Sequence, residues 1–215
     1  MARLTSTQIT QLNNMNRAAQ NAGLGTRLDA IQYGTATVPS AGTLTSLSAM
    51  EYATTPAVGT ATYVHAAIAL TDATQTVTTS ITNPDFPRIV TVKGNASGIT
   101  GNVVITGTNY VGATISDTIA LNGATEVLGA KAFKTVTSIA LPVEVHAGTD
   151  TVSIGVGNKI GFPIAIPNAS VVIAKTFDGS ADSSTITAAA TVEGSLAAVA
   201  GTFNGTKIYK LVFLA

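Results

Sequence analysis

The spacing of hydrophobic positions changes twice along the 215-residue chain. Over residues 1–34, apolar side chains recur every three or four positions, which is the spacing of an amphipathic helix. Residues 35–61 are rich in Ala, Thr, Ser, Gly and Pro with weak periodicity, which predicts an extended linker. From residue 62 to residue 215 the period is two, which is typical of β-strands. We therefore expect a short N-terminal helical arm, an extended linker and a β body.

The arm carries the signals of capped helices. Thr5 and Gln8 have the spacing of a capping box, and Gly23 is placed to end the first helix. Thr26 and Asp29 predict a second, short helix that ends before Gly34.

The apolar stripe of the arm is too narrow to form a core alone, so the arm must dock on another surface. It could dock on its own β body or on a partner subunit. The linker favours a partner, because about 25 residues of extended chain let the arm reach well away from the body. The residues expected to make this contact are Leu4, Ile9, Leu12, Met15, Leu24, Leu28 and Ile31.

The body reads as a series of short strands bounded by Gly, Asn, Asp or Pro. Ten or so strands without intervening helices predict a mainly β fold, a β-sandwich or a jelly-roll-like body. The expected strands are 64–70, 76–81, 89–94, 102–107, 113–121, 133–141, 150–157, 170–177, 184–192 and 207–214.

Three local patterns give sharper expectations. Asp117 shares a strand face with Ile115 and Ile119, so we expect it near a sheet edge. The last strand, 207–214, ends in a nearly continuous apolar run and should be central or covered, because an exposed apolar edge would aggregate. The glycine-rich run GVGNKIGFP at 155–163 is interpreted as a turn that leaves a strand.

Composition narrows the class of partner. Formal net charge is zero and 10% of residues are charged, which argues against binding nucleic acid, since phosphates require clustered Lys and Arg. So few charges also remove the usual source of solubility for a free monomer. A chain of this kind fits a protein that is packed in an assembly, and the alternative is a neutral extracellular domain. No apolar stretch approaches the ~18 residues of a membrane span, and the polar N-terminus is unlike a secretory signal, so we expect synthesis in a cytoplasm and no membrane partner.

Candidate chemistry is sparse. The chain has no Cys, and His65 and His146 lack the spacing of a metal site, so both are interpreted as structural. No motif for a nucleophilic serine or a phosphate loop is present, and DGSAD at 178–182 is interpreted as a hairpin loop rather than a calcium loop. The sequence therefore predicts neither an enzyme nor a cofactor.

Three segments resemble structural proteins of tailed-bacteriophage virions. The run 97–142 contains GNVVITG, ALNG and KAFKTVTSI, and the run 152–172 continues with VSIGVGNKIGFPIAIPNASVV. The opening QLNNMNRAAQNAGLGTRL at 11–28 is similar to N-terminal segments of capsid-decoration and head-fibre proteins.

The resemblance implies a structural role on the outside of a capsid. It implies the major capsid protein as partner, self-association with three copies as the expected oligomer, and location on the virion surface. Two alternatives stay open: a tail or baseplate structural protein, and a carbohydrate-binding module used for adsorption.

Overall fold

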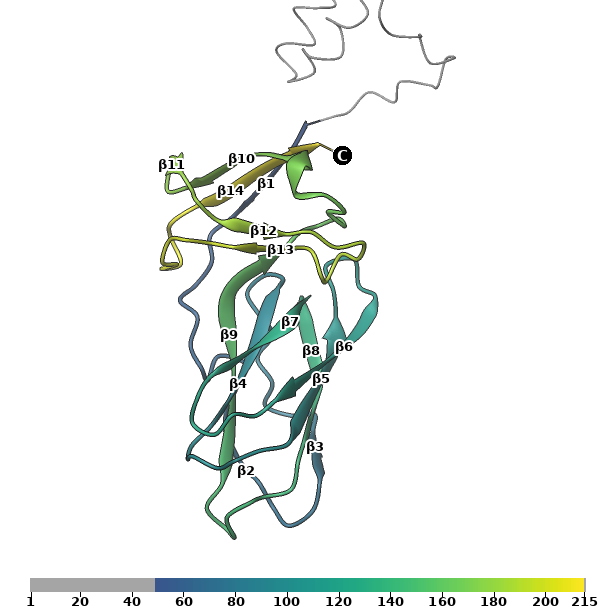
Figure 1. Ribbon diagram of the computed structural model, residues 1–215, viewed down its shortest axis with the longest axis vertical. Coiled ribbons are helices and arrows are strands. Elements are labelled where there is room, and N and C mark those ends of the chain that lie inside the picture. The colour runs from purple at the N-terminus through teal and green to yellow at the C-terminus, as the bar shows by residue number, and fades with distance from the viewer. Residues whose placement is uncertain (1–48, 215) are drawn as a thin grey trace, which may run out of the picture. The chain divides into compact units, whose positions relative to one another are not determined.

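The computed structural model of the chain describes residues 49–214 (Figure 1). The predicted arm at 1–34 and its contact residues lie outside the described residues. The described chain is mainly β, as predicted, and its sheets are antiparallel and build a sandwich-like body. Its elements are β1 (Ala49–Thr54), β2 (His65–Ala69), β3 (Gln75–Val77), β4 (Arg88–Gly94), β5 (Asn102–Thr108), β6 (Thr114–Ala120), β7 (Val127–Phe133), β8 (Thr135–Leu141), β9 (Thr151–Gly161), the 3-10 turn η1 (Ala169–Val171), β10 (Val172–Phe177), β11 (Ser180–Ala181), β12 (Thr185–Thr187), β13 (Leu196–Ala198) and β14 (Tyr209–Leu214).

Three sheets make up the body (Figure 1). The terminal sheet has the order β1-β14-β10-β11, and it contains both ends of the described chain. The middle sheet has the order β12-β13-β9-β4-β7, with β2 also paired to β9. The outer sheet has the order β3-β8-β5-β6.

Two large hydrophobic cores lie between these sheets, beside a small third cluster of Ile89, Ala132 and Leu196. The first core packs the middle sheet on the outer sheet, because alternate residues of β5 and β8 face those of β4 and β9. The second core packs the terminal sheet on β13 and on the end of β9. Fully burying one such aliphatic or aromatic side chain stabilises the fold by about 1.5–3 kcal/mol. Representative residues are Val90, Val92, Ile105, Ile139 and Ile154 in the first core and Ile160, Phe162, Leu211 and Phe213 in the second.

The long strand β9 joins the two cores. Its residues Ile154 and Val156 belong to the first core, whereas Ile160 belongs to the second. The strand continues without interruption through 155–161, so the turn predicted there is wrong. We call the region where β9 passes from one core to the other the junction.

Close packing explains the glycines that suggested a turn. A Cβ on Gly155 would lie 2.3 Å from the Thr60 carbonyl oxygen, and one on Gly161 would lie 2.5 Å from the Ala132 Cβ. A strand glycine can mark a place where another backbone approaches closely, as well as a turn. In β9 the glycines let neighbouring chain segments lie directly on the strand.

Two strand predictions are confirmed by the sheet order. β6, which carries Asp117, is an edge strand of the outer sheet, and β14 lies between β1 and β10. The hairpin loop predicted at 178–182 is also present, since Asp178 and Gly179 form the turn between β10 and β11 with φ values of 52° and 81°. Positive φ at both central residues suits a two-residue hairpin turn.

Other boundaries differ from the prediction. Residues 49–54, which the sequence placed in the linker, form β1 and pair with β14 from Ala49↔Leu214 to Thr54↔Tyr209. The strand predicted at 184–192 is limited to Thr185–Thr187. β7 and β13 were not predicted, because Gly and Ala in these strands weaken the β-branched pattern.

One buried hydroxyl offers a test of the first core. The Thr91 Oγ1 atom in β4 is buried and has no hydrogen-bond partner among the described residues. Thr91→Val keeps the shape and removes the unsatisfied polar group, so the free energy of unfolding should rise by about 1 kcal/mol in urea denaturation. Thr108→Val is the control, because the Thr108 hydroxyl is 2.7 Å from the Thr135 hydroxyl and its loss should destabilise the fold. A Thr91→Val protein less stable than the wild type would contradict this assignment.

Candidate functional site

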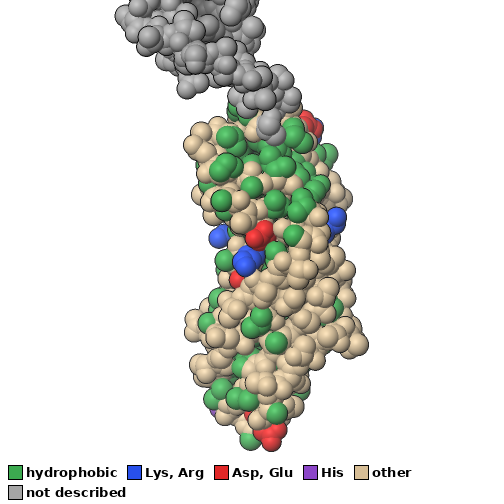
Figure 2. Space-filling model, turned by 90° about the vertical axis from the view of Figure 1, so that its right-hand side faces the viewer, with side chains coloured by type: hydrophobic (Ala, Val, Ile, Leu, Met, Phe, Trp, Pro, Cys, Tyr) green, Lys and Arg blue, Asp and Glu red, His purple; other side chains and the backbone are tan. Residues whose placement is uncertain are grey.

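The end of the terminal sheet presents apolar side chains to solvent. Met50 in β1 pairs with Phe213, and Ile173 forms a bulge in β10 beside the same residue. The exposed fraction of Met50 is 43% and that of Ile173 is 54%. Figure 2 shows hydrophobic side chains spread over this upper part of the body, with few charged groups among them. We call the surface around Met50 and Ile173 the apolar end.

A groove of about 430 Å³ lies at the junction. Its lining comes from four separate places in the sequence: strand β1, the segment before β4, the β5–β6 turn and the corner between β7 and β8. The lining residues are Tyr52, Ala53, Thr54, Pro84, Asp85, Phe86, Pro87, Tyr110, Lys134 and Thr135. We call this site the junction groove.

Aromatic rings form one part of the junction groove. The Tyr52 and Tyr110 ring centroids are 6.2 Å apart and their planes meet at 80°, so the two phenols form a corner. The Lys134 ammonium lies 5.6 Å from the Tyr110 ring centroid, within the range of a cation–π contact. Burial, together with the nearby Tyr110 and Asp85, raises the pKa of Tyr52 well above its ordinary value. The Tyr52 hydroxyl therefore stays protonated and able to donate a hydrogen bond.

The turn that carries Tyr110 is held in place from both sides. The Asn109 side-chain oxygen accepts hydrogen bonds from the Val111 and Ala113 amides, at 3.1 and 3.0 Å. The Asn109 side-chain nitrogen donates to the Glu193 carboxylate at 3.1 Å. This turn is thereby tied to the loop between β12 and β13, which positions the Tyr110 ring.

A buried arginine contacts two residues that line the junction groove, Asp85 and Phe86. The Arg88 side chain has no solvent-exposed surface, and its Nε and one terminal nitrogen donate to the Gly157 carbonyl at 2.9 and 2.7 Å. The other terminal nitrogen donates to the Ala57 carbonyl at 3.1 Å and to the Asp85 carboxylate at 3.2 Å. A guanidinium suits this position because it presents several donors in a fixed plane.

The surroundings of Arg88 combine aromatic rings with one carboxylate. The guanidinium carbon lies 5.3 Å from the Phe86 ring centroid and 5.4 Å from that of Phe203. Burial lowers the pKa of Arg88 and the adjacent Asp85 opposes that shift. The second Asp85 oxygen accepts a hydrogen bond from the Ala57 amide at 2.7 Å. Both oxygens of Asp85 are therefore engaged in holding the junction together.

Asp117 is also structural. Its Oδ2 atom accepts hydrogen bonds from the Ala130 amide at 2.7 Å and the Lys131 amide at 3.2 Å. These amides belong to a stretch of β7 whose register with β4 shifts. A Cβ on Gly129 would lie 2.6 Å from the same carboxylate oxygen, so the glycine admits the contact. Asp117 thus ties the edge of the outer sheet to the middle sheet.

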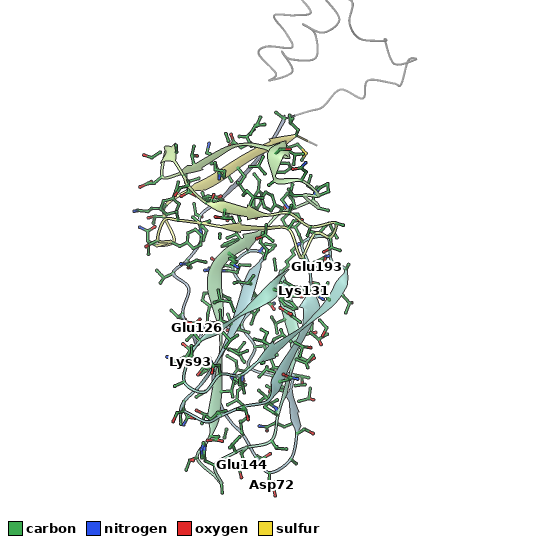
Figure 3. The ribbon with its side chains drawn as sticks, in the orientation of Figure 1. Asp72, Lys93, Glu126, Lys131, Glu144 and Glu193 are labelled. Carbon is green, nitrogen blue, oxygen red and sulfur yellow. The ribbon has the colours of Figure 1, made fainter. Side chains whose placement is uncertain are left out.

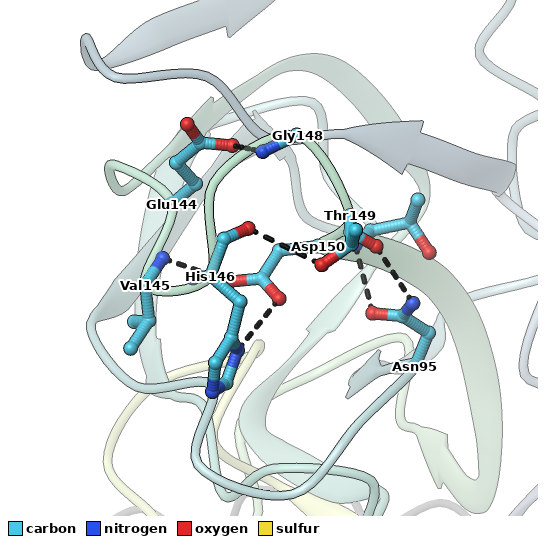
Figure 4. A network of polar contacts seen from close by, with 8 residues as sticks. Asn95, Glu144, Val145, His146, Gly148, Thr149 and Asp150 are labelled. Carbon is cyan, nitrogen blue, oxygen red and sulfur yellow. Dashed lines mark hydrogen bonds and ion pairs between the residues drawn. The ribbon is translucent and has the colours of Figure 1, made fainter.

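Polar contacts close the loop between β8 and β9 (Figure 4). The Asp150 side chain is 1% exposed, accepts hydrogen bonds from the Val145 and His146 amides at 2.8 Å each, and lies 2.9 Å from the His146 ring nitrogen. Asn95 exchanges hydrogen bonds with Thr149 and Thr151 across this loop. These contacts satisfy the backbone of the loop, which supports the structural interpretation of His146.

The loop around Asp150 should respond to acid. Burial acts to raise the pKa of Asp150, but the hydrogen bonds from His146 and Val145 outweigh it and hold the pKa below its ordinary value of 3.8. A depressed pKa contributes stability above the unfolded-state pKa that is lost as the pH falls through the folded-state pKa. Asp150→Asn should flatten the pH dependence of unfolding between about pH 5 and about pH 2. Asp178→Asn, in the exposed β10–β11 turn, is the control, and equal flattening by both substitutions would contradict the assignment.

Charged residues elsewhere on the body do not gather into a further site. Figure 3 shows Asp72 and Glu144 at one end of the body and Lys131 and Glu193 close to the junction. Among residues 49–214, no three His, Asp or Glu side chains lie together so as to hold a metal ion. No helix within that part of the chain is long and apolar enough to cross a membrane. His65, in β2, contacts only the neighbouring Ala66 carbonyl through its ring nitrogen, at 2.8 Å, among the hydrogen bonds described.

Sequence reasoning did not find the junction groove. Its aromatic residues are spread from position 52 to position 110, and none belongs to a recognisable motif. Comparison of the chain with protein-family models, with curated protein sequences and with solved structures finds no match.

Proposed function

We propose that the chain is a structural protein of a tailed-phage virion, a decoration protein that binds the outer surface of the capsid and stabilises it. The observation that carries the proposal is the apolar end, where Met50 and Ile173 are exposed on a body with few charges. Exposed apolar side chains on a nearly uncharged surface favour burial against neighbouring subunits. The resemblance of 97–142, 152–172 and 11–28 to phage virion proteins supports the same role.

The proposed mechanism is attachment through several modest contacts. The apolar end provides one contact with the major capsid protein. The arm residues Leu4, Ile9, Leu12, Met15, Leu24, Leu28 and Ile31 provide a second. Linking two contacts in one chain raises the overall affinity through effective concentration, and a trimer would multiply it further. The body then contributes a rigid element, because one strand and one buried arginine join its two cores.

A pair of matched substitutions tests this proposal. Ile173→Glu places a charge on the apolar end, and Val145→Glu places one on an equally exposed residue, 49% against 54%, in the loop between β8 and β9. Burying an unpaired carboxylate is unfavourable, so Ile173→Glu should weaken capsid binding by at least about tenfold. Val145→Glu should leave binding unchanged. The measurement is co-sedimentation of the full chain with empty capsids of the phage that encodes it.

Removing residues 1–34 tests the contribution of the arm separately. The shortened protein should occupy capsids less completely than the full chain at equal concentration. Undiminished occupancy would remove the arm from the mechanism. Wild-type protein that does not sediment with capsids would overturn the proposed function as a whole.

A further inference from the structure

We propose that the junction groove binds an acidic saccharide, with sugar rings packed on Tyr52 and Tyr110 and a sugar carboxylate paired with Lys134. This activity is separate from capsid attachment and does not rest on it. The groove lies beside the strand β1 and the junction, and its residues take no part in the contacts proposed for the apolar end or the arm.

The shape and lining of the junction groove match a small ligand with apolar faces. Its volume of about 430 Å³ falls within the range of ligand sites, which are commonly 300–1,000 Å³ and lined largely by aromatic and apolar side chains. Tyr52, Tyr110 and Phe86 supply rings, and Pro84 and Pro87 supply rigid apolar surface. The C–H face of a sugar ring packs on such surfaces. Scarcity of aromatic residues in the whole chain does not exclude a saccharide, because three of them come together here.

The polar groups of the junction groove favour a ligand that carries hydroxyls. The hydroxyls of Tyr52 and Tyr110 have no hydrogen-bond partner among residues 49–214, and each can donate and accept. Both oxygens of Asp85 already accept bonds from Ala57 and Arg88. Sugar hydroxyls can both donate to a phenol and accept from it.

The charge of the junction groove favours a carboxylate on that ligand. The negative charge of Asp85 is compensated by Arg88, with which it forms an ion pair. Lys134 is exposed and forms no ion pair with any residue of 49–214. The Lys134 amide donates to the Thr108 carbonyl at 2.7 Å, which fixes the backbone that carries the ammonium. One uncompensated cation beside aromatic rings suits a ligand that places a carboxylate next to a sugar ring.

The test uses the full chain and two series of oligosaccharides of equal length. Oligogalacturonate provides rings with carboxylates and maltooligosaccharide provides neutral rings, and binding is followed by saturation-transfer NMR and calorimetric titration. Lys134→Ala should weaken oligogalacturonate binding by about tenfold or more. Lys207→Ala is the matched control, because Lys207 lies over Phe177 at 5.5 Å in the same kind of contact but outside the groove. Tyr110→Ala should abolish binding, and far-UV circular dichroism of each variant verifies that it folds.

The outcomes separate cleanly. Binding of oligogalacturonate that is stronger than that of maltooligosaccharide, lost in Lys134→Ala and kept in Lys207→Ala, supports the proposal. Absence of saturable binding, equal affinity for both series, equal effects of the two lysine substitutions, or a preference for a poly-glutamate peptide would overturn it. None of these results bears on capsid attachment, which is measured with Ile173→Glu.

Discussion

Replacing Arg88 by methionine is expected to lower the free energy of unfolding by about 3–5 kcal/mol, the cost of breaking a buried ion pair by removing one partner. Methionine has no donor for the Gly157 and Ala57 carbonyls, which the guanidinium satisfies in the wild type. It also leaves the Asp85 carboxylate without its cation. Equilibrium urea denaturation followed by far-UV circular dichroism measures the change.

Two further variants identify the cause of this loss. Lys93→Met changes an exposed cation of the same strand β4 and should have little effect. Arg88→Met combined with Asp85→Asn should be less destabilised than the sum of the two single changes, because the two residues interact directly. An Arg88→Met protein as stable as the wild type would contradict the role of Arg88 at the junction.

Gly155→Ala is expected to lower the free energy of unfolding by about 3 kcal/mol, at the upper end of the usual cost of overpacking. The new Cβ would lie 2.3 Å from the Thr60 carbonyl oxygen and 2.6 Å from the Ala61 Cα. Both are backbone atoms, so the methyl group fits only if a neighbouring chain segment moves away from β9. Urea denaturation again measures the change.

Gly157→Ala is the matched control, two residues along the same strand. Its Cβ would lie 2.9 and 3.0 Å from the Ile89 Cδ1 and Cγ1 atoms, which are side-chain atoms and can shift without moving a neighbouring backbone segment. Gly157→Ala should therefore cost less than half as much as Gly155→Ala. Equal costs would show that glycine is needed in β9 for a reason other than the backbone approach at Thr60.

The parts of the fold that the sequence predicts are those governed by local alternation. In β5 and β6 successive residues alternate between the buried and the solvent-facing side of the sheet, and both strands match the prediction to within one residue. Asp117 signalled an edge strand because a carboxylate cannot lie in the middle of an apolar face without partners. The apolar run at 207–214 predicted a covered strand, because an apolar strand left at the edge of a sheet would aggregate.

The parts that the sequence does not predict depend on partners distant in the chain. The glycines of β9 resemble turn glycines until the segment at Thr60 is known to lie on the strand. β1 has an Ala- and Thr-rich sequence like the linker around it, and its strand geometry comes from pairing with β14. Arg88 would be taken for a surface residue, and only the folded chain brings carbonyls from Gly157 and Ala57 to it. The junction groove is lined by four segments that are far apart in the sequence, and no local pattern in any of them marks a binding site.

Direct labelling of particles tests the proposed function most plainly. An antibody raised against residues 49–214 is applied to virions purified from a lysate that contains the protein, and bound antibody is located by immunogold electron microscopy. Dense labelling over the whole head surface is the predicted result. Labelling confined to the tail, or particles that carry no label while the protein is present in the same lysate, would contradict a capsid decoration protein.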